Sequence, residues 1–166
     1  VSGPAALPPT PESAQPGLHA RVTALISEYD EKWSSLDVAG LAALWERHTP
    51  QPIYLGDEYP EPLAGAEALE RHWARMAGRI KRASVTSRLW SAETLAGGLA
   101  RCVVLSRWSF TGRESDTAHS GTSWITWLLT RRGNRYLIVH HMESQVYLGD
   151  GLGPGDPPGH DAQPAP

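Results

Sequence analysis

The chain has 166 residues, of which 40% are hydrophobic, and its formal net charge is −3. This length suits one domain with a sizeable core. The charges are nearly balanced and form no Lys/Arg cluster, so the sequence carries no nucleic-acid-binding footprint. No apolar run is long enough to span a membrane. Neither a nucleic acid nor a membrane is therefore expected as a partner.

Cys102 is the only cysteine, which excludes an internal disulfide bond. It falls within an apolar strand pattern, so a buried, unreactive thiol is favoured over a catalytic one. The sequence starts at Val1 and does not indicate a compartment. A cytoplasmic protein fits, and so does a secreted or periplasmic one whose signal segment was removed.

Both ends of the chain are rich in proline or glycine. Residues 1–17 and 148–166 lack apolar periodicity and have too few apolar residues to offset the entropy of ordering. We expect two disordered tails that flank one domain at residues 18–147.

Three helices are predicted in the first half of the domain. Apolar residues at helical spacing predict a helix over 18–34, and Asp37 suits the N-cap of a short second helix. A short strand over 52–56 and a turn-rich segment follow. A third helix is predicted over 65–78 from an apolar stripe made of Ala66, Leu69, Trp73 and Met76.

From Ile80 onward the helical period gives way to strand patterns. Gly-containing turn signals separate four predicted strands, at 81–93, 99–110, 118–130 and 135–147. Short turns of this kind favour an antiparallel meander. The sequence therefore predicts an α+β fold in which three N-terminal helices pack on a curved antiparallel sheet.

The strand predicted over 118–130 is apolar on both faces. Ile125 and Trp127 point one way, whereas Trp124 and Leu128 point the other. A sheet with one face on solvent alternates more cleanly. We expect the helices to cover one face and a second copy of the chain to cover the other, as a homodimer.

Three segments carry a resemblance to a known family. Residues 29–45 form a helix, a small Asp/Gly turn and a second helix, and Pro62-Leu-Ala-Gly65 precedes an amphipathic helix. Residues 133–144 are similar to a closing strand of pattern G-x-W-x-I-V-H-x-H-x-S, with Tyr136 in place of Trp and Met142 where a second His is common. Together they resemble the nuclear transport factor 2-like superfamily, close to its SnoaL-like and DUF4440-type branches.

The resemblance implies a cone-shaped, cystatin-like α+β domain built around one internal pocket. The same fold supports ketosteroid isomerases, polyketide cyclases, dehydratases and epoxide hydrolases. It also supports the association domain of a calmodulin-dependent kinase, so the fold does not fix the function.

The resemblance suggests two catalytic residues in the first half of the chain. Tyr29 is similar in position to the oxyanion-hole tyrosine of the isomerases, which stabilises developing charge; a plain core tyrosine is the alternative. Asp57, followed by Glu58, comes near the place of the isomerases' general base. The alternative there is a solvated turn, since residues 57–62 have turn composition.

Strict alternation puts five residues on one face of the last strand: Tyr136, Ile138, His140, Met142 and Ser144. The resemblance directs this face inward, so His140 is expected to act in the pocket as an acid, base or orienting group. A core histidine is the alternative. His141 and Glu143 are expected on the outer face, as a structural pair at the dimer interface.

The other candidates for the pocket wall are mostly aromatic, and core packing is the alternative for each of them: Trp33, Tyr54, Trp73, Trp90, Trp108, Trp124, Met142 and Ser144. An inward Arg101 would hold a carboxylate ligand bidentately. The opposite face of its strand is more apolar, so we expect Arg101 to point outward. His72 is expected on a half-exposed surface.

No zinc-ligand spacing, phosphate-binding loop or dinucleotide fingerprint occurs, so no cofactor is expected. The leading hypothesis is a SnoaL-like enzyme that uses acid–base chemistry on an apolar carbonyl-bearing or cyclic substrate, by isomerisation, cyclisation, dehydration or hydration. Its ligand is expected to be small and apolar or to carry a carboxylate. The alternative is a non-catalytic ligand-binding or association domain.

Overall fold

The computed structural model describes residues 16–146. Its elements are α1 (Pro16–Ser34), α2 (Val38–Ala43), β1 (Ile53–Leu55), β2 (Leu63–Ala64), α3 (Ala66–Arg79), β3 (Ile80–Thr94), the 3₁₀ turn η1 (Ala96–Gly98), β4 (Leu99–Gly112), β5 (Ala118–Arg132) and β6 (Arg135–Gln145). The predicted tails lie outside the described residues, except that α1 already begins at Pro16.

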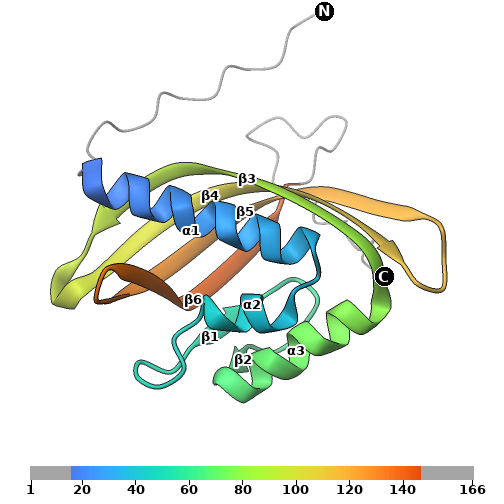
Figure 1. The fold of residues 1–166 in the computed structure, drawn as a ribbon, viewed down its shortest axis with the longest axis horizontal. Helices are drawn as coiled ribbons and strands as arrows, with labels where there is room; N and C mark the ends of the chain where they lie inside the picture. The colour runs from blue at the N-terminus through green and yellow to red at the C-terminus, as the bar shows by residue number, and fades with distance from the viewer. Residues whose placement is uncertain (1–15, 147–166) are drawn as a thin grey trace, which may run out of the picture.

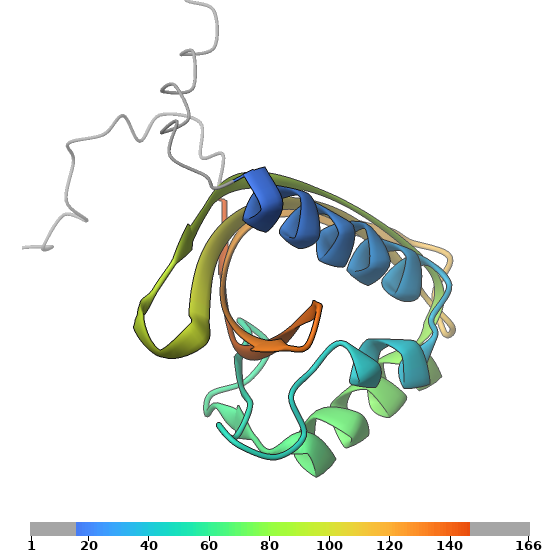
Figure 2. The same cartoon turned by 60° about the vertical axis from the view of Figure 1, so that its left-hand side comes forward.

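The strands form one six-stranded sheet in the order β2-β1-β6-β5-β4-β3. The meander from β3 to β6 is antiparallel as predicted, whereas β1 runs parallel to β6, so the sheet is mixed. The two-residue β2 is too short to show an alternating pattern, and the sequence does not predict it. The sheet curls around α1, and α2 and α3 lie across the remaining side (Figures 1 and 2). This arrangement confirms the α+β prediction.

Helix α1 lies along β3, which is the edge strand of the sheet. The Ser87 backbone N–H donates to Asp30 Oδ2 at 2.6 Å, and the Ser87 hydroxyl donates to Asp30 Oδ1 at 2.7 Å. The Val85 N–H donates to Ser34 Oγ at 3.1 Å. These bonds satisfy edge N–H groups that no neighbouring strand can reach. They also fix the rotation of α1 and hence the direction of its inner side chains.

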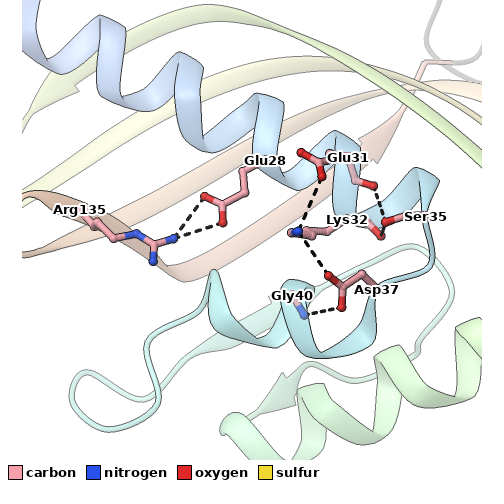
Figure 3. A network of polar contacts seen from close by, with 7 residues as sticks. All are labelled: Glu28, Glu31, Lys32, Ser35, Asp37, Gly40 and Arg135. Atoms are coloured by element: carbon pink, nitrogen blue, oxygen red, sulfur yellow. Dashed lines mark hydrogen bonds and ion pairs between the residues drawn. The ribbon is translucent and has the colours of Figure 1, made fainter.

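Lys32 joins the end of α1 to the start of α2 (Figure 3). Its Nζ lies 3.3 Å from Asp37 Oδ2 and 3.8 Å from Glu31 Oε1. Asp37 is the N-cap of α2, as predicted, because its Oδ1 accepts a hydrogen bond from the Gly40 N–H at 2.8 Å. Exposed ion pairs add little stability, so the capping bond is the interaction that starts α2 here.

One extra residue interrupts the pairing of β6 with β5. Leu128 of β5 pairs with His140, whereas the next residue, Leu129, pairs with Ile138. Val139 is therefore a bulge residue without a partner in β5. A bulge of this kind shifts the inward–outward alternation of its strand by one residue.

The bulge reverses the prediction for the second half of β6. His141 is fully buried and Glu143 lines the interior, whereas Met142 is 47% exposed on the outer face beside His140. The expectation that His140, Met142 and Ser144 point inward was therefore wrong. Strict period-2 alternation fails here because Val139 has no partner in β5, so the residues after it face the opposite way from the prediction.

The core lies between the inner sheet face and the helices. On β4 the inner positions Ala100, Cys102 and Val104 are fully buried and Arg101 is exposed, as expected. Burial raises the pKa of the Cys102 thiol to about 12, which fits an unreactive core cysteine. Within residues 16–146, no helix combines the length and the hydrophobicity that a bilayer crossing requires.

Candidate functional site

A cavity of about 250 Å³ lies between the inner sheet face and the helices. Three small side chains lie in register across the middle of the sheet, namely Ser87, Ser106 and Ser123. Ser106 lines the cavity, while larger residues flank it on both sides. A small side chain at the centre of β4 thus forms part of the cavity wall.

Five of the residues singled out from the sequence lie on the cavity wall: Tyr29, Trp33, Tyr54, Asp57 and Trp108. They come from α1, β1, the turn after β1, and β4. The fold therefore brings together residues that are as far apart in the sequence as Tyr29 and Trp108.

Other predicted wall residues lie on the opposite face of the sheet. Besides the three residues of β6, Trp124 is directed outward, because it pairs in register with Leu105 and Ser144. Trp90 packs against Trp124 with ring centroids 5.5 Å apart. Placing Trp90 and Trp124 in the pocket was therefore wrong. Trp73 is buried on the inner side but packs behind Trp33 instead of lining the cavity.

A histidine–carboxylate pair, His141 and Glu143, was expected on the outer face but lies on the inner one, with Glu143 on the cavity wall and His141 buried behind it. The Trp127 indole N–H donates to His141 Nδ1 at 2.9 Å. Because Nδ1 accepts, the proton of neutral His141 resides on Nε2, which lies 3.4 Å from Glu143 Oε2. Glu143 lines the cavity. The consecutive apolar residues 137–139 are the one sequence signal of the bulge that turns this pair inward.

Glu143 is held in its ionised form. Burial raises the pKa of its carboxyl. Hydrogen bonds from His141 and Ser123, together with the charge interaction that a protonated His141 would add, keep the pKa below its ordinary value. Glu143 is therefore anionic and can accept a proton from a ligand in the cavity, although its lowered pKa makes it a weaker base than a free glutamate.

The Tyr29 phenol stays protonated, whereas the Glu143 carboxyl is ionised. Burial, together with the negative charge of Glu143, raises the pKa of its phenol far above the ordinary value, so the hydroxyl stays protonated. Trp33 interacts with the Tyr29 oxygen and can only donate, which leaves the phenolic proton for a ligand. Tyr29 also packs edge-on against Trp127, with ring centroids 5.1 Å apart.

A second histidine–carboxylate pair lies on the other side of Tyr54. The Tyr54 hydroxyl donates to Glu58 Oε1 at 2.8 Å, and His72 Nε2 lies 3.7 Å from the same oxygen. The Tyr54 ring lies between the two histidines, with centroids 4.9 Å from His72 and 4.7 Å from His141. Tyr54 therefore separates the two pairs.

His72 is fully buried, so the half-exposed position predicted for it was wrong. The turn after β1 covers it: Tyr59 lies 2.8 Å from His72 Nδ1 and accepts a hydrogen bond from Arg75. The Tyr59 proton is consequently directed to Nδ1, and the His72 proton lies on Nε2. Burial lowers the pKa of His72 to about 4.

Asp57 lies at the exposed rim of the cavity. Its Oδ2 accepts a hydrogen bond from the Gln145 N–H at 3.1 Å, which ties the turn after β1 to the end of β6. In the part of the chain that the structure describes, no three His, Cys, Asp or Glu side chains are grouped to hold a metal ion.

A continuous aromatic surface forms the remaining wall. Trp108 stacks on Phe110 with centroids 5.4 Å apart, and Phe110 lies 5.6 Å from Trp33. The Trp108 indole N–H donates to Ser123 Oγ at 3.0 Å. The indole lies directly over Gly121, where a Cβ would come within 2.5 Å of the ring. Gly121 is thus required for Trp108 to lie flat on the sheet.

A family model described as a SnoaL-like domain matches residues 22–148. The chain belongs to the SnoaL-like family of the nuclear transport factor 2-like superfamily. The resemblance inferred from residues 29–45 and 133–144 is thereby confirmed. Among curated proteins, none matches the sequence significantly.

Several solved structures share the fold. A ketosteroid isomerase-like protein from Erwinia carotovora atroseptica has a TM-score of 0.68 at 12% identity, over 81% of this chain and 99% of that one. A candidate aromatic ring hydroxylase from Novosphingobium aromaticivorans has a TM-score of 0.72 at 8% identity, over 81% and 93%. A candidate calcium/calmodulin-dependent protein kinase II association domain from Xanthomonas campestris has a TM-score of 0.65 at 15% identity, over 88% and 98%. Identities this low establish the common fold alone.

Proposed function

We propose that this SnoaL-like protein is an enzyme that moves a proton on a small, largely apolar carbonyl-bearing or cyclic substrate, without a cofactor. The observation that supports it most strongly is the hydrogen-bonded series Trp127–His141–Glu143, which ends in a carboxylate on the cavity wall. A core packed only for stability has no need of a buried histidine held in one tautomer behind a carboxylate.

Glu143 is the proposed general base. It takes a proton from a carbon next to the substrate carbonyl, and the electron pair of the broken C–H bond moves onto the carbonyl oxygen as an enolate. If Glu143 returns the proton to another carbon, the substrate is isomerised. If Glu143 gives it to a β-hydroxyl as the C–O bond breaks, the substrate loses water. His141 acts as a positioning residue, because its Nε2–H holds the carboxylate in place.

Tyr29 is the proposed donor to the substrate oxygen. A protonated phenol in a cavity of low polarity stabilises developing negative charge more strongly than water does. The aromatic surface of Trp33, Phe110 and Trp108 would hold a flat or cyclic substrate body. Asp57, the base expected from the sequence, lies at the rim and is assigned no proton transfer.

The test is exchange of carbon-bound hydrogen for deuterium. A panel of cyclic ketones is incubated with the protein in D2O, and loss of the α-proton signal is followed by NMR. We expect acceleration over buffer for the ketones that bind. The Glu143→Gln variant should lose about 10²–10⁴-fold of this acceleration, the usual contribution of a positioned base.

Glu93→Gln is the matched control, since Glu93 lies on the exposed end of β3, in an ion pair with Arg101. It should exchange protons like the parent protein. Ketones that bind in the cavity without any accelerated exchange would contradict the proposed function and favour a ligand-binding domain.

A homodimer is also proposed, through the outer face of the sheet. It is supported by apolar side chains there that no described helix covers, including the Trp90–Trp124 pair, and by Met142 and Ile53, which are 47% and 36% exposed. A similar structure is named as an association domain, and that function needs a surface of this kind. The dimer is compatible with either role of the cavity.

A further inference from the structure

The charged groups on the cavity wall all have the same sign. Asp57, Glu58 and Glu143 line it, and no Lys or Arg of residues 16–146 does so. The whole chain carries 15 Lys and Arg against 18 Asp and Glu, so a one-sided composition is not the reason. The fold has gathered negative charge at this site.

Neither neighbouring histidine offsets this charge. His141 accepts a hydrogen bond at Nδ1 from the Trp127 indole, which only a neutral imidazole can do. His72 is fully buried, and its low pKa, set mainly by burial, keeps it neutral at pH 7. An occupant of the cavity therefore meets uncompensated negative charge.

The apolar part of the wall consists of rings held in fixed positions. Phe110 packs against both Trp33 and Trp108. Trp108 is fixed by its bond to Ser123 and by the close fit over Gly121. Aromatic faces carry negative electrostatic potential and attract ammonium groups. The rings and the carboxylates therefore favour the same kind of ligand.

We propose that the cavity binds an organic cation: a protonated or quaternary amine carried on an apolar one- or two-ring body. The ammonium lies among the carboxylates of Asp57, Glu58 and Glu143 and leaves one Glu143 oxygen free to take the proton. The ring body lies against Trp33, Phe110 and Trp108. This inference rests on the proposed function, because it names the substrate class of the same cavity. A carboxylate-bearing ligand, which the sequence left open, would meet three like charges and is not favoured.

The carboxylates at the rim of the cavity also favour a cationic ligand. Asp57 and Glu58 are exposed at the entrance, and the Glu58 oxygen that accepts from Tyr54 lies 3.7 Å from His72 Nε2, a buried donor without a hydrogen-bond partner. A cleft lined by one sign of charge raises the local concentration of oppositely charged ligands. Cation binding should therefore weaken as salt increases.

The experiment compares three ligands of similar shape and different charge: tryptamine, tryptophol and indole-3-propionate. Binding is measured by isothermal titration calorimetry at pH 7 and low salt. We expect tryptamine to bind at least tenfold more tightly than tryptophol, and indole-3-propionate to bind most weakly. Glu143→Gln should reduce the preference for tryptamine over tryptophol at least fivefold, whereas Glu93→Gln, remote from the cavity, should not.

Equal or tighter binding of tryptophol overturns the inference, and so does the absence of binding by tryptamine. Binding needs no proton transfer, so the two proposals fail separately. A cation preference that depends on Glu143, with no accelerated exchange in D2O, would overturn the proposed function alone. Accelerated exchange without a cation preference would overturn the ligand class alone.

Discussion

The Trp127 indole N–H donates to Nδ1 of His141 at 2.9 Å, from the strand next to it in the sheet. Since the indole can only donate, this bond determines which nitrogen of His141 carries the proton. The Nε2–H then faces Glu143, so a tryptophan that never reaches the cavity sets the hydrogen bonding of its wall.

Trp127→Phe removes this donor while keeping an aromatic ring in the core. The unpaired Nδ1 of buried His141 should destabilise the protein by about 1–3 kcal/mol, measured by urea denaturation. Proton-detected nitrogen correlation spectra of the histidines should show a change of tautomer. Trp124→Phe, on the outer face of the same strand, should leave the His141 spectrum unchanged. An unaltered tautomer in Trp127→Phe would contradict the assignment.

The two adjacent histidines should respond in opposite ways to the same substitution. His141→Asn should lower accelerated proton exchange at least tenfold, because the Glu143 carboxylate loses its supporting donor. His140→Asn should leave exchange within about twofold, since His140 faces away from the cavity. A larger loss in His140→Asn than in His141→Asn would contradict the bulge at Val139. Circular dichroism checks that both variants fold.

His72 predicts a dependence of stability on pH. The folded protein keeps His72 neutral down to a pKa of about 4, whereas the unfolded chain protonates it near the ordinary value of 6.5. Between these values the unfolded state binds more protons, so stability falls as pH decreases from 6.5 to 4, by about 3 kcal/mol in total. His72→Gln should flatten the urea-denaturation free energy over this range. If the unfolding free energy of His72→Gln depended on pH as steeply as that of the parent protein, a group other than His72 would be responsible for the pH dependence.

Gly121→Ala should displace the Trp108 indole. The added Cβ would lie 2.5 Å from Trp108 Cζ2, and that ring is held against the sheet by its bond to Ser123. We expect ligand affinity in the cavity to fall at least tenfold while the fold is retained. Gly78→Ala, at a glycine of α3 with open space around it, should leave affinity unchanged and slightly raise the melting temperature. Unchanged affinity in Gly121→Ala would exclude Trp108 from the site.

Leu105→Arg should convert the proposed dimer to monomers. Leu105 lies on the outer face, paired in register with Trp124, and a cation there would be buried without a partner. Light scattering at micromolar concentration should give the mass of two chains for the parent protein and of one for the variant. Ser27→Arg, at an exposed position of α1, which covers the other face of the sheet, should remain dimeric. A parent protein of monomeric mass would exclude the dimer.

The sequence predicted the fold well because periodicity reports directly on burial. The helix that begins near Leu18 and the four long strands match the structure to within two residues at each end. The Asp37 cap was also predictable, since its chemistry is local. The aromatic wall was predictable in part, because a tryptophan at an inner strand position either packs in the core or lines the cavity.

The polar half of the site was less predictable, for two physical reasons. One bulge residue, Val139, exchanged the faces of His140 and His141, and alternation cannot be counted through a residue that leaves the ladder. His72 is buried by Tyr59 across a turn, a contact between segments that no local pattern encodes. Glu143 was consequently expected outside, although it is the carboxylate on which the proposed chemistry depends.

The bulge gives β6 two alternative sets of side chains for the interior. If Val139 paired with Leu128 instead of bulging, regular pairing would turn the end of the strand over. His140, Met142 and Ser144 would then replace His141, Glu143 and Gln145 on the inner face. A one-residue change in the register of this strand thus separates an acidic from a nearly uncharged cavity. Alignments of related sequences that place the His-His pair by position alone will compare side chains from opposite faces.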